Sequence, residues 1–116
     1  MALKRGDTVL VPFPFTDLSS RKVRPAIIIS PDPQAEDILV SFISSSPPDK
    51  LAATDFLLES KHPDFSKSGL KRTSVFKLNK LLTLHHSVIF RRLGSISKQL
   101  QKEIDERLAR AVGLAK

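Results

Sequence analysis

An arginine stands at the entrance of an apolar run, where it is placed to bind an oxyanion. Arg24 follows the polar segment 15–23 and directly precedes Pro25, the first residue of the apolar run 25–30. Proline restricts the backbone of the residue before it to extended conformations, so Arg24 would be held by a stiff segment. A guanidinium stays charged and forms paired hydrogen bonds with phosphate oxygens. The chemistry predicted here is binding of a phosphate and stabilisation of negative charge on it.

Positive charge is concentrated in one third of the chain. Residues 61–98 hold nine Lys and Arg against one Asp, a net charge of +8, whereas residues 1–60 carry −2 and residues 99–116 carry +1. Such a block indicates a polyanionic partner, either a nucleic acid or an acidic protein segment. A solubilising surface is the alternative. Because the chain has no Trp and no Tyr, only Phe, His and Arg are available to stack on bases.

A pair of histidines that flank one phosphate could catalyse cleavage of a phosphodiester without a metal, and the sequence does not favour such a pair. His85 and His86 are adjacent, and in an extended chain neighbouring side chains point to opposite faces. We therefore expect that they do not flank one phosphate. His62 stands before a proline in an irregular segment, where an exposed, inert side chain is expected. No His, Asp and Glu residues recur at metal-ligand spacing, so neither a metal nor another cofactor is expected.

Length and composition predict one soluble domain over residues 1–116. Apolar residues make up 41% and charged residues 27% of the chain, which is ordinary for a globular protein. No apolar run approaches the roughly 20 residues of a membrane span. The chain has no cysteine, which agrees with a reducing compartment, and we expect it in the cytoplasm.

Several short apolar segments separated by turn residues predict a mainly β fold. We expect strands at 8–13, 25–30, 38–43, 54–58, 73–78, 81–84 and 87–93, with an irregular stretch at 59–69 that includes a helical turn. The run 25–30 is apolar almost throughout, which is typical of a strand buried on both faces.

The last twenty residues change to helical spacing. Leu100, Ile104, Leu108 and Ala111 recur every three or four residues, which predicts an amphipathic helix. Ser97 is a suitable N-cap and Gly113 a suitable residue just beyond the C-terminal end.

Six segments resemble the PemK/MazF toxins of bacterial toxin–antitoxin pairs. The opening Gly6–Phe13 and the run Arg24–Ser30 resemble the family pattern GDVVLVPFPF, a loop, and RPALVLS. Four later segments resemble other family motifs in the same order: Ile43–Ser45, Ser68–Val75, Lys77–Thr83 and Leu93–Ser97.

The resemblance implies a small SH3-like barrel of about five to seven short strands with a C-terminal α-helix. It also implies a homodimer that cleaves single-stranded RNA without a metal and is inhibited by an acidic antitoxin. The residues held catalytic in the family fall on Arg24 and Ser44. The RNA-binding positions that we predict are Phe15, Arg21, Lys22, Ser45, Lys71, Arg72, Lys77 and Asn79.

Two departures from the family pattern leave alternatives open. Ser44 stands where the family has threonine, and Asn79 stands where some members have a catalytic aspartate, so the chain could be a member with weakened activity. A CcdB-like toxin, which shares the fold and poisons DNA gyrase, is a second alternative. A non-catalytic basic SH3-like module that binds RNA or an acidic peptide is the third.

Overall fold

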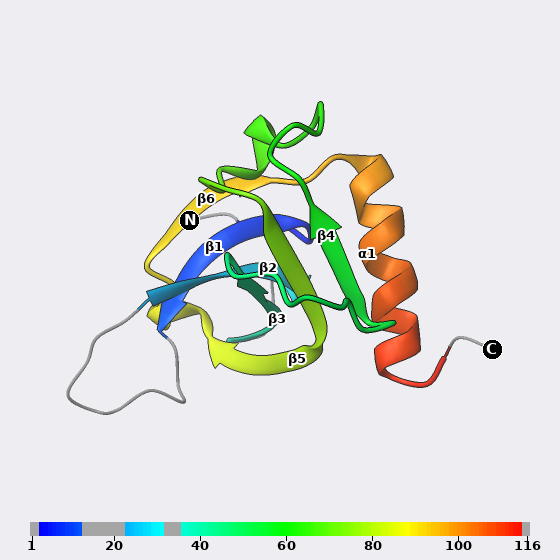
Figure 1. Ribbon diagram of the computed structural model, residues 1–116. Coiled ribbons are helices and arrows are strands. Elements are labelled where there is room, and N and C mark those ends of the chain that lie inside the picture. Colours follow the sequence, from blue (N-terminus) through cyan, green and yellow to red (C-terminus); the bar gives the residue numbers. More distant parts are fainter. Residues whose placement is uncertain (1–2, 13–22, 32–35, 115–116) are drawn as a thin grey trace.

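The described part of the chain consists of six strands, two 3-10 helices and a C-terminal α-helix. The computed structural model describes residues 3–12, 23–31 and 36–114 (Figure 1). The elements are β1 (Asp7–Pro12), β2 (Val23–Pro31), β3 (Asp37–Ser44), β4 (Asp55–Leu58), the 3-10 helix η1 (Ser66–Ser68), β5 (Ser74–His85), the 3-10 helix η2 (His86–Val88), β6 (Arg91–Ser95) and α1 (Lys98–Ala111).

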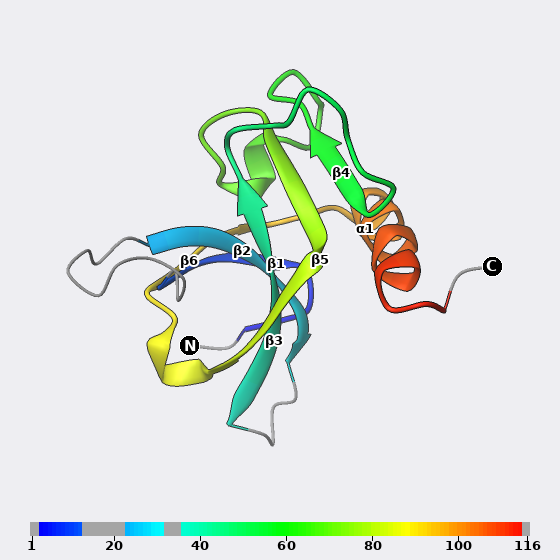
Figure 2. The same cartoon turned by 60° about the horizontal axis from the view of Figure 1, so that its bottom comes forward.

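The described strands form one curled antiparallel sheet. Its six strands lie in the order β4-β5-β3-β2-β1-β6, so β2 and β3 lie near its centre. Figure 2 shows how β3 and β5 cross the molecule together while β1 and β2 curve around it. This arrangement confirms the predicted mainly β fold with a C-terminal helix, and the strand number lies within the predicted five to seven.

Both faces of the sheet are buried. Val9, Ala26, Ile28, Val40 and Phe42 belong to the apolar cluster on one face, the inner side of the curl. Alternate residues of the same strands point to the other face, whose cluster has the following members: Ile27, Ile29, Ile43, Leu58, Phe76, Leu78, Leu100 and Ile104. The prediction that the run 25–30 is buried on both faces is therefore confirmed for Ala26 to Ile29.

Helix α1 covers the second of these faces, beside β4 (Figure 1). It begins after Ser97, whose Oγ accepts a hydrogen bond from the Leu100 amide at 3.2 Å. Gly113 has φ +79° just beyond its end, as the sequence predicts for a residue in this position. In addition to its packing against the sheet, α1 contacts the start of the chain through an ion pair between Arg5 and Asp105.

Three predicted strands are wrong in detail. The expected strands at 73–78 and 81–84 are one strand, β5, which continues through a local irregularity. The expected strand at 87–93 begins only at Arg91, because His86–Val88 form η2, which the His85 side chain caps.

Candidate active site

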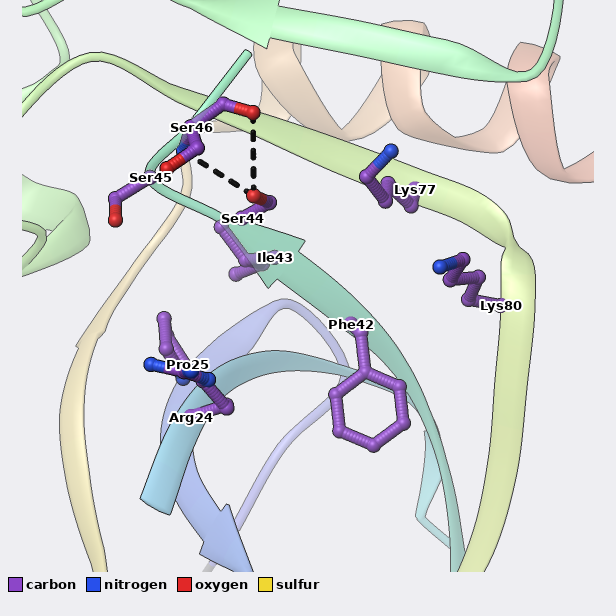
Figure 3. Close-up of a pocket in the computed structure, with 9 residues that line it drawn as sticks. All are labelled: Arg24, Pro25, Phe42, Ile43, Ser44, Ser45, Ser46, Lys77 and Lys80. Carbon is purple, nitrogen blue, oxygen red and sulfur yellow. Dashed lines mark hydrogen bonds between the residues drawn. The ribbon is translucent and has the colours of Figure 1, made fainter. Parts of the chain in front are cut away.

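A cavity of about 290 Å³ opens where β2 and β3 separate (Figure 3). The pairing of the two strands ends at Ala26 and Phe42. Continuing the same register by two residues would place Arg24 opposite Ser44, and both residues line the cavity. The two residues that are far apart in the sequence are thus brought to the same end of two neighbouring strands.

Proline accounts for the end of the ladder at this point. Pro25 lacks the backbone N–H that a further hydrogen bond would need. It still pairs in register with Leu10 on its other side, so β2 remains anchored to β1 up to Val23. Arg24 is therefore held on an ordered strand while its exposed side chain reaches the cavity.

The Ser44 hydroxyl is held by the turn that follows β3. Its Oγ accepts a hydrogen bond from the Ser46 amide at 3.1 Å and lies 3.4 Å from the Ser46 carbonyl oxygen (Figure 3). The longer contact is the weaker one, so the hydroxyl hydrogen can turn towards a ligand while the amide still fixes the oxygen. Ser44 can donate a hydrogen bond to a phosphate held by Arg24.

A second cavity of about 510 Å³ adjoins the first. Both are lined by Arg24, Pro25 and Ser45, so Arg24 stands at their junction. The second cavity brings Lys71 and Arg72 together with Arg91, which comes from β6. The combined groove crosses the ends of several strands, with Arg24 near its middle.

The groove is strongly cationic. Its described lining residues include six with a positive charge and no Asp or Glu: Arg24, Lys71, Arg72, Lys77, Lys80 and Arg91. Five of the nine basic residues in the block 61–98 are among them, so more than half of the positive charges of this block lie on one surface. Arg92 is different, since its Nε lies 3.3 Å from Oδ2 of the buried Asp7 and so neutralises an internal carboxylate.

The structure places most of the predicted site residues in this groove. Arg24, Ser44, Ser45 and Lys77 line the first cavity, whereas Lys71 and Arg72 line the second. Asn79 lines neither cavity. Its neighbour Lys80, which we did not predict, lines the first cavity instead. Phe15, Arg21 and Lys22 lie outside the described residues.

The two adjacent histidines do not point to opposite faces, so that expectation is wrong. Their rings stack with centroids 4.6 Å apart, because β5 ends at His85 and the chain turns into η2. His85 pairs with Asp37, at the end of β3 opposite to Ser44. The distance along β3 is seven residues, or roughly 23 Å, so the pair is remote from the groove.

The described part of the chain holds neither a metal site nor a membrane-spanning helix. No group of three or more His, Cys, Asp or Glu side chains that could hold a metal ion occurs among the described residues. Among the helices of those residues, none is long and apolar enough to cross a membrane.

Solved structures share this fold over nearly the whole chain. The chain superposes on an endoribonuclease in complex with its cognate antitoxin from a Mycobacterial species, with a TM-score of 0.78, 18% identity and 99% of each chain covered. For the Mycobacterium tuberculosis toxin MazF-mt6 the TM-score is 0.73 at 17% identity, covering 95% of this chain and 99% of that chain. For a MazE-MazF structure from Deinococcus radiodurans it is 0.73 at 16% identity, covering 97% and 98%. These identities support a shared fold.

Sequence comparison identifies the family. No curated protein sequence matches the chain. The family model described as PemK-like, MazF-like toxin of type II toxin-antitoxin system matches residues 4–112, which include every described strand and the whole of α1. The chain therefore belongs to the PemK-like, MazF-like family of toxins.

Proposed function

We propose that this chain is a sequence-specific endoribonuclease that cleaves single-stranded RNA without a metal and so inhibits growth. The observation that carries the proposal is the shared cavity of Arg24 and Ser44, which offers a guanidinium and a hydroxyl to one phosphate. The similarity of the fold to those of endoribonucleases from Mycobacterial species supports it. We place the activity in the cytoplasm, where such a substrate would be met.

RNA supplies its own nucleophile for this reaction. The 2′ oxygen attacks the adjacent phosphorus, the bond from phosphorus to the 5′ oxygen breaks, and the proton lost from the 2′-OH is balanced by the one gained by the 5′ oxygen. The products are a 2′,3′-cyclic phosphate and a free 5′-OH. The enzyme's main task is to stabilise the negative charge that develops on the non-bridging oxygens.

Arg24 and Ser44 divide this task between them. The Arg24 fork can hold both non-bridging oxygens, since a guanidinium matches phosphate geometry and stays charged. The Ser44 hydroxyl adds one hydrogen bond from the neighbouring strand. Because the Ser46 amide holds the Ser44 oxygen and β1 holds the Arg24 backbone before the substrate binds, little reorganisation of the backbone is needed when the charge develops.

The rest of the groove would hold the RNA on either side of the cleaved bond. Phosphate contacts from Lys71, Arg72 and Lys77 would supply affinity that does not depend on sequence. Ser45 lies between the two cavities and can donate a hydrogen bond. We keep Phe15, Arg21, Lys22 and Asn79 as proposed RNA-binding residues, the first for stacking on a base.

Cleavage in the presence of a chelator is the first test. We expect the purified chain to cut single-stranded RNA of mixed sequence in excess EDTA, at a restricted set of sites that sequencing of the products would identify. RNA that stays intact in every sequence context would contradict the proposal. Cutting that stops in EDTA and resumes with a divalent ion would contradict the metal-free mechanism.

Two protein partners complete the proposal, a second copy of the chain and an acidic antitoxin. Phe90 is 71% exposed and Val88 39% exposed, which leaves apolar surface that a second copy could cover. The cationic groove suits an acidic segment as well as RNA. In chromatography with light scattering, we expect twice 12.9 kDa for the chain alone and a larger mass with the acidic protein encoded beside its gene. A monomeric mass would contradict the dimer, and an unchanged mass with the acidic protein would contradict that partner.

A further inference from the structure

The pairing of β3 with β5 is interrupted beside the first cavity. Phe42 pairs with Lys77, whereas the preceding residue, Ser41, pairs with Leu81. Residues 78–80 of β5 therefore have no counterpart on β3 and form a bulge of three residues. Bulges are common next to active sites, where they change the direction of a side chain.

The bulge changes which residues face the cavity. In a regular strand, residues three apart point to opposite faces, so Lys77 and Lys80 would be separated. Beyond the bulge, Leu82 pairs with Val40 on the inner face of the sheet. Lys80 precedes Leu82 by two positions and so returns to that face, and Figure 3 shows both lysines beside the cavity.

Buried contacts hold the bulge in place. Ser41 is 0% exposed, and its Oγ donates a hydrogen bond to the Lys77 carbonyl oxygen at 2.6 Å. The Leu78 amide donates to the Thr54 carbonyl oxygen at 3.1 Å, and the Leu78 side chain lies in the apolar cluster under α1. The bulge is thus anchored from β3 and from the residue before β4.

The charge beside this cavity exceeds what one phosphate needs. Arg24, Lys77 and Lys80 together carry three positive charges, and the described lining has no carboxylate. A single phosphodiester group carries one negative charge. Arg24 and Ser44 suffice for the phosphate that reacts, which leaves the lysine side of the cavity for another.

We propose that the bulge at residues 78–80 makes Lys80 a binding residue for a second RNA phosphate, next to the one held by Arg24 and Ser44. This inference rests on the proposed function for the identity of the ligand. A lysine suits the role because its ammonium group contacts phosphate as a compact charge from a long, adaptable stem.

The salt dependence of RNA binding tests this assignment without requiring cleavage. The probe is a fluorescent 2′-O-methyl RNA of mixed sequence, which keeps every phosphate and lacks the nucleophile. Each phosphate contact on a single strand contributes about −0.7 to the slope of log K against log salt. We expect Lys80→Gln to make the slope less negative by about 0.7 and Lys80→Arg to preserve it.

Two control variants separate this contact from general effects. Lys98→Gln removes the same charge at the start of α1, outside both cavities. Lys80→Arg keeps the positive charge at the bulge, and both variants should keep the slope of the original chain. A slope that Lys80→Gln leaves unchanged, or that Lys98→Gln alters equally, would overturn the assignment while leaving the proposed function intact. Failure of the original chain to bind the probe would overturn both.

Discussion

Replacing Arg24 with alanine should lower the rate of RNA cleavage by about 100-fold or more, the usual effect of losing one stabiliser of developing negative charge. Arg24→Ala should lower mainly the rate constant of the cleavage step and should weaken RNA binding less, because the other cations of the groove remain. Arg24 lies at the junction of both cavities, so no second described cation occupies an equivalent place. The measurement is single-turnover cleavage of a labelled RNA at saturating enzyme.

Two further variants show whether the guanidinium itself is needed. Arg24→Lys keeps the charge and loses the planar fork, so we expect it to recover only a small part of the rate. Asn79→Ala should change the rate far less, because Asn79 is exposed and lines neither cavity. Equal losses at positions 24 and 79 would contradict this division of roles. An unchanged toxic effect of Arg24→Ala in cells would favour a target other than RNA, such as gyrase.

Replacing Gly69 with alanine should destabilise the fold by about 2–4 kcal/mol, from a strained backbone and overpacking together. Gly69 has φ +72°, and a Cβ there would lie 2.2 Å from the Leu93 carbonyl oxygen. The segment that contains Gly69 packs against β6 and leads directly into Lys71 and Arg72. We therefore expect a melting temperature lower by roughly 10 °C and weaker RNA binding.

Gly113 provides the matched control for this prediction. It has φ +79°, close to the φ of Gly69, and a Cβ there would meet no atom within 4 Å. Gly113→Ala should cost only the conformational part, about 1–2 kcal/mol, and leave RNA binding unchanged. Equal destabilisation by the two substitutions in thermal unfolding would show that the contact with Leu93 is unimportant.

Local sequence patterns were sufficient for the elements that depend on neighbouring residues. The apolar run after Arg24 predicted a strand buried on both faces, and the spacing of Leu100, Ile104 and Leu108 predicted α1. The continuity of β5 was not predictable in this way. Asn79 and Lys80 interrupt the apolar pattern, which predicts a break between two strands. In the structure, hydrogen bonds that join β5 to Ser41 and Thr54 hold the strand continuous at this point.

In the candidate site, too, some residues could be predicted from the local sequence, whereas others depend on contacts with distant parts of the chain. Arg24 was found from its place before a proline, and Ser44 from the family resemblance. Lys80 could not be found, because alternation along β5 points to Asn79 until the register with β3 is known. The different roles of Arg91 and Arg92 likewise depend on a distant residue, the buried Asp7 on β1.

The chemistry of the RNA ends tests the central claim most directly. Once a cleaved position is known, two labelled RNAs would be treated with the chain in EDTA, one all-ribose and one with a single 2′-deoxy nucleotide 5′ to the cleaved bond. Mass spectrometry should find a 2′,3′-cyclic phosphate and a 5′-OH from the first RNA, and the second should bind but stay intact. Cleavage of the 2′-deoxy RNA at that bond, or products with a 5′-phosphate, would contradict attack by the 2′-OH at the phosphate held by Arg24 and Ser44.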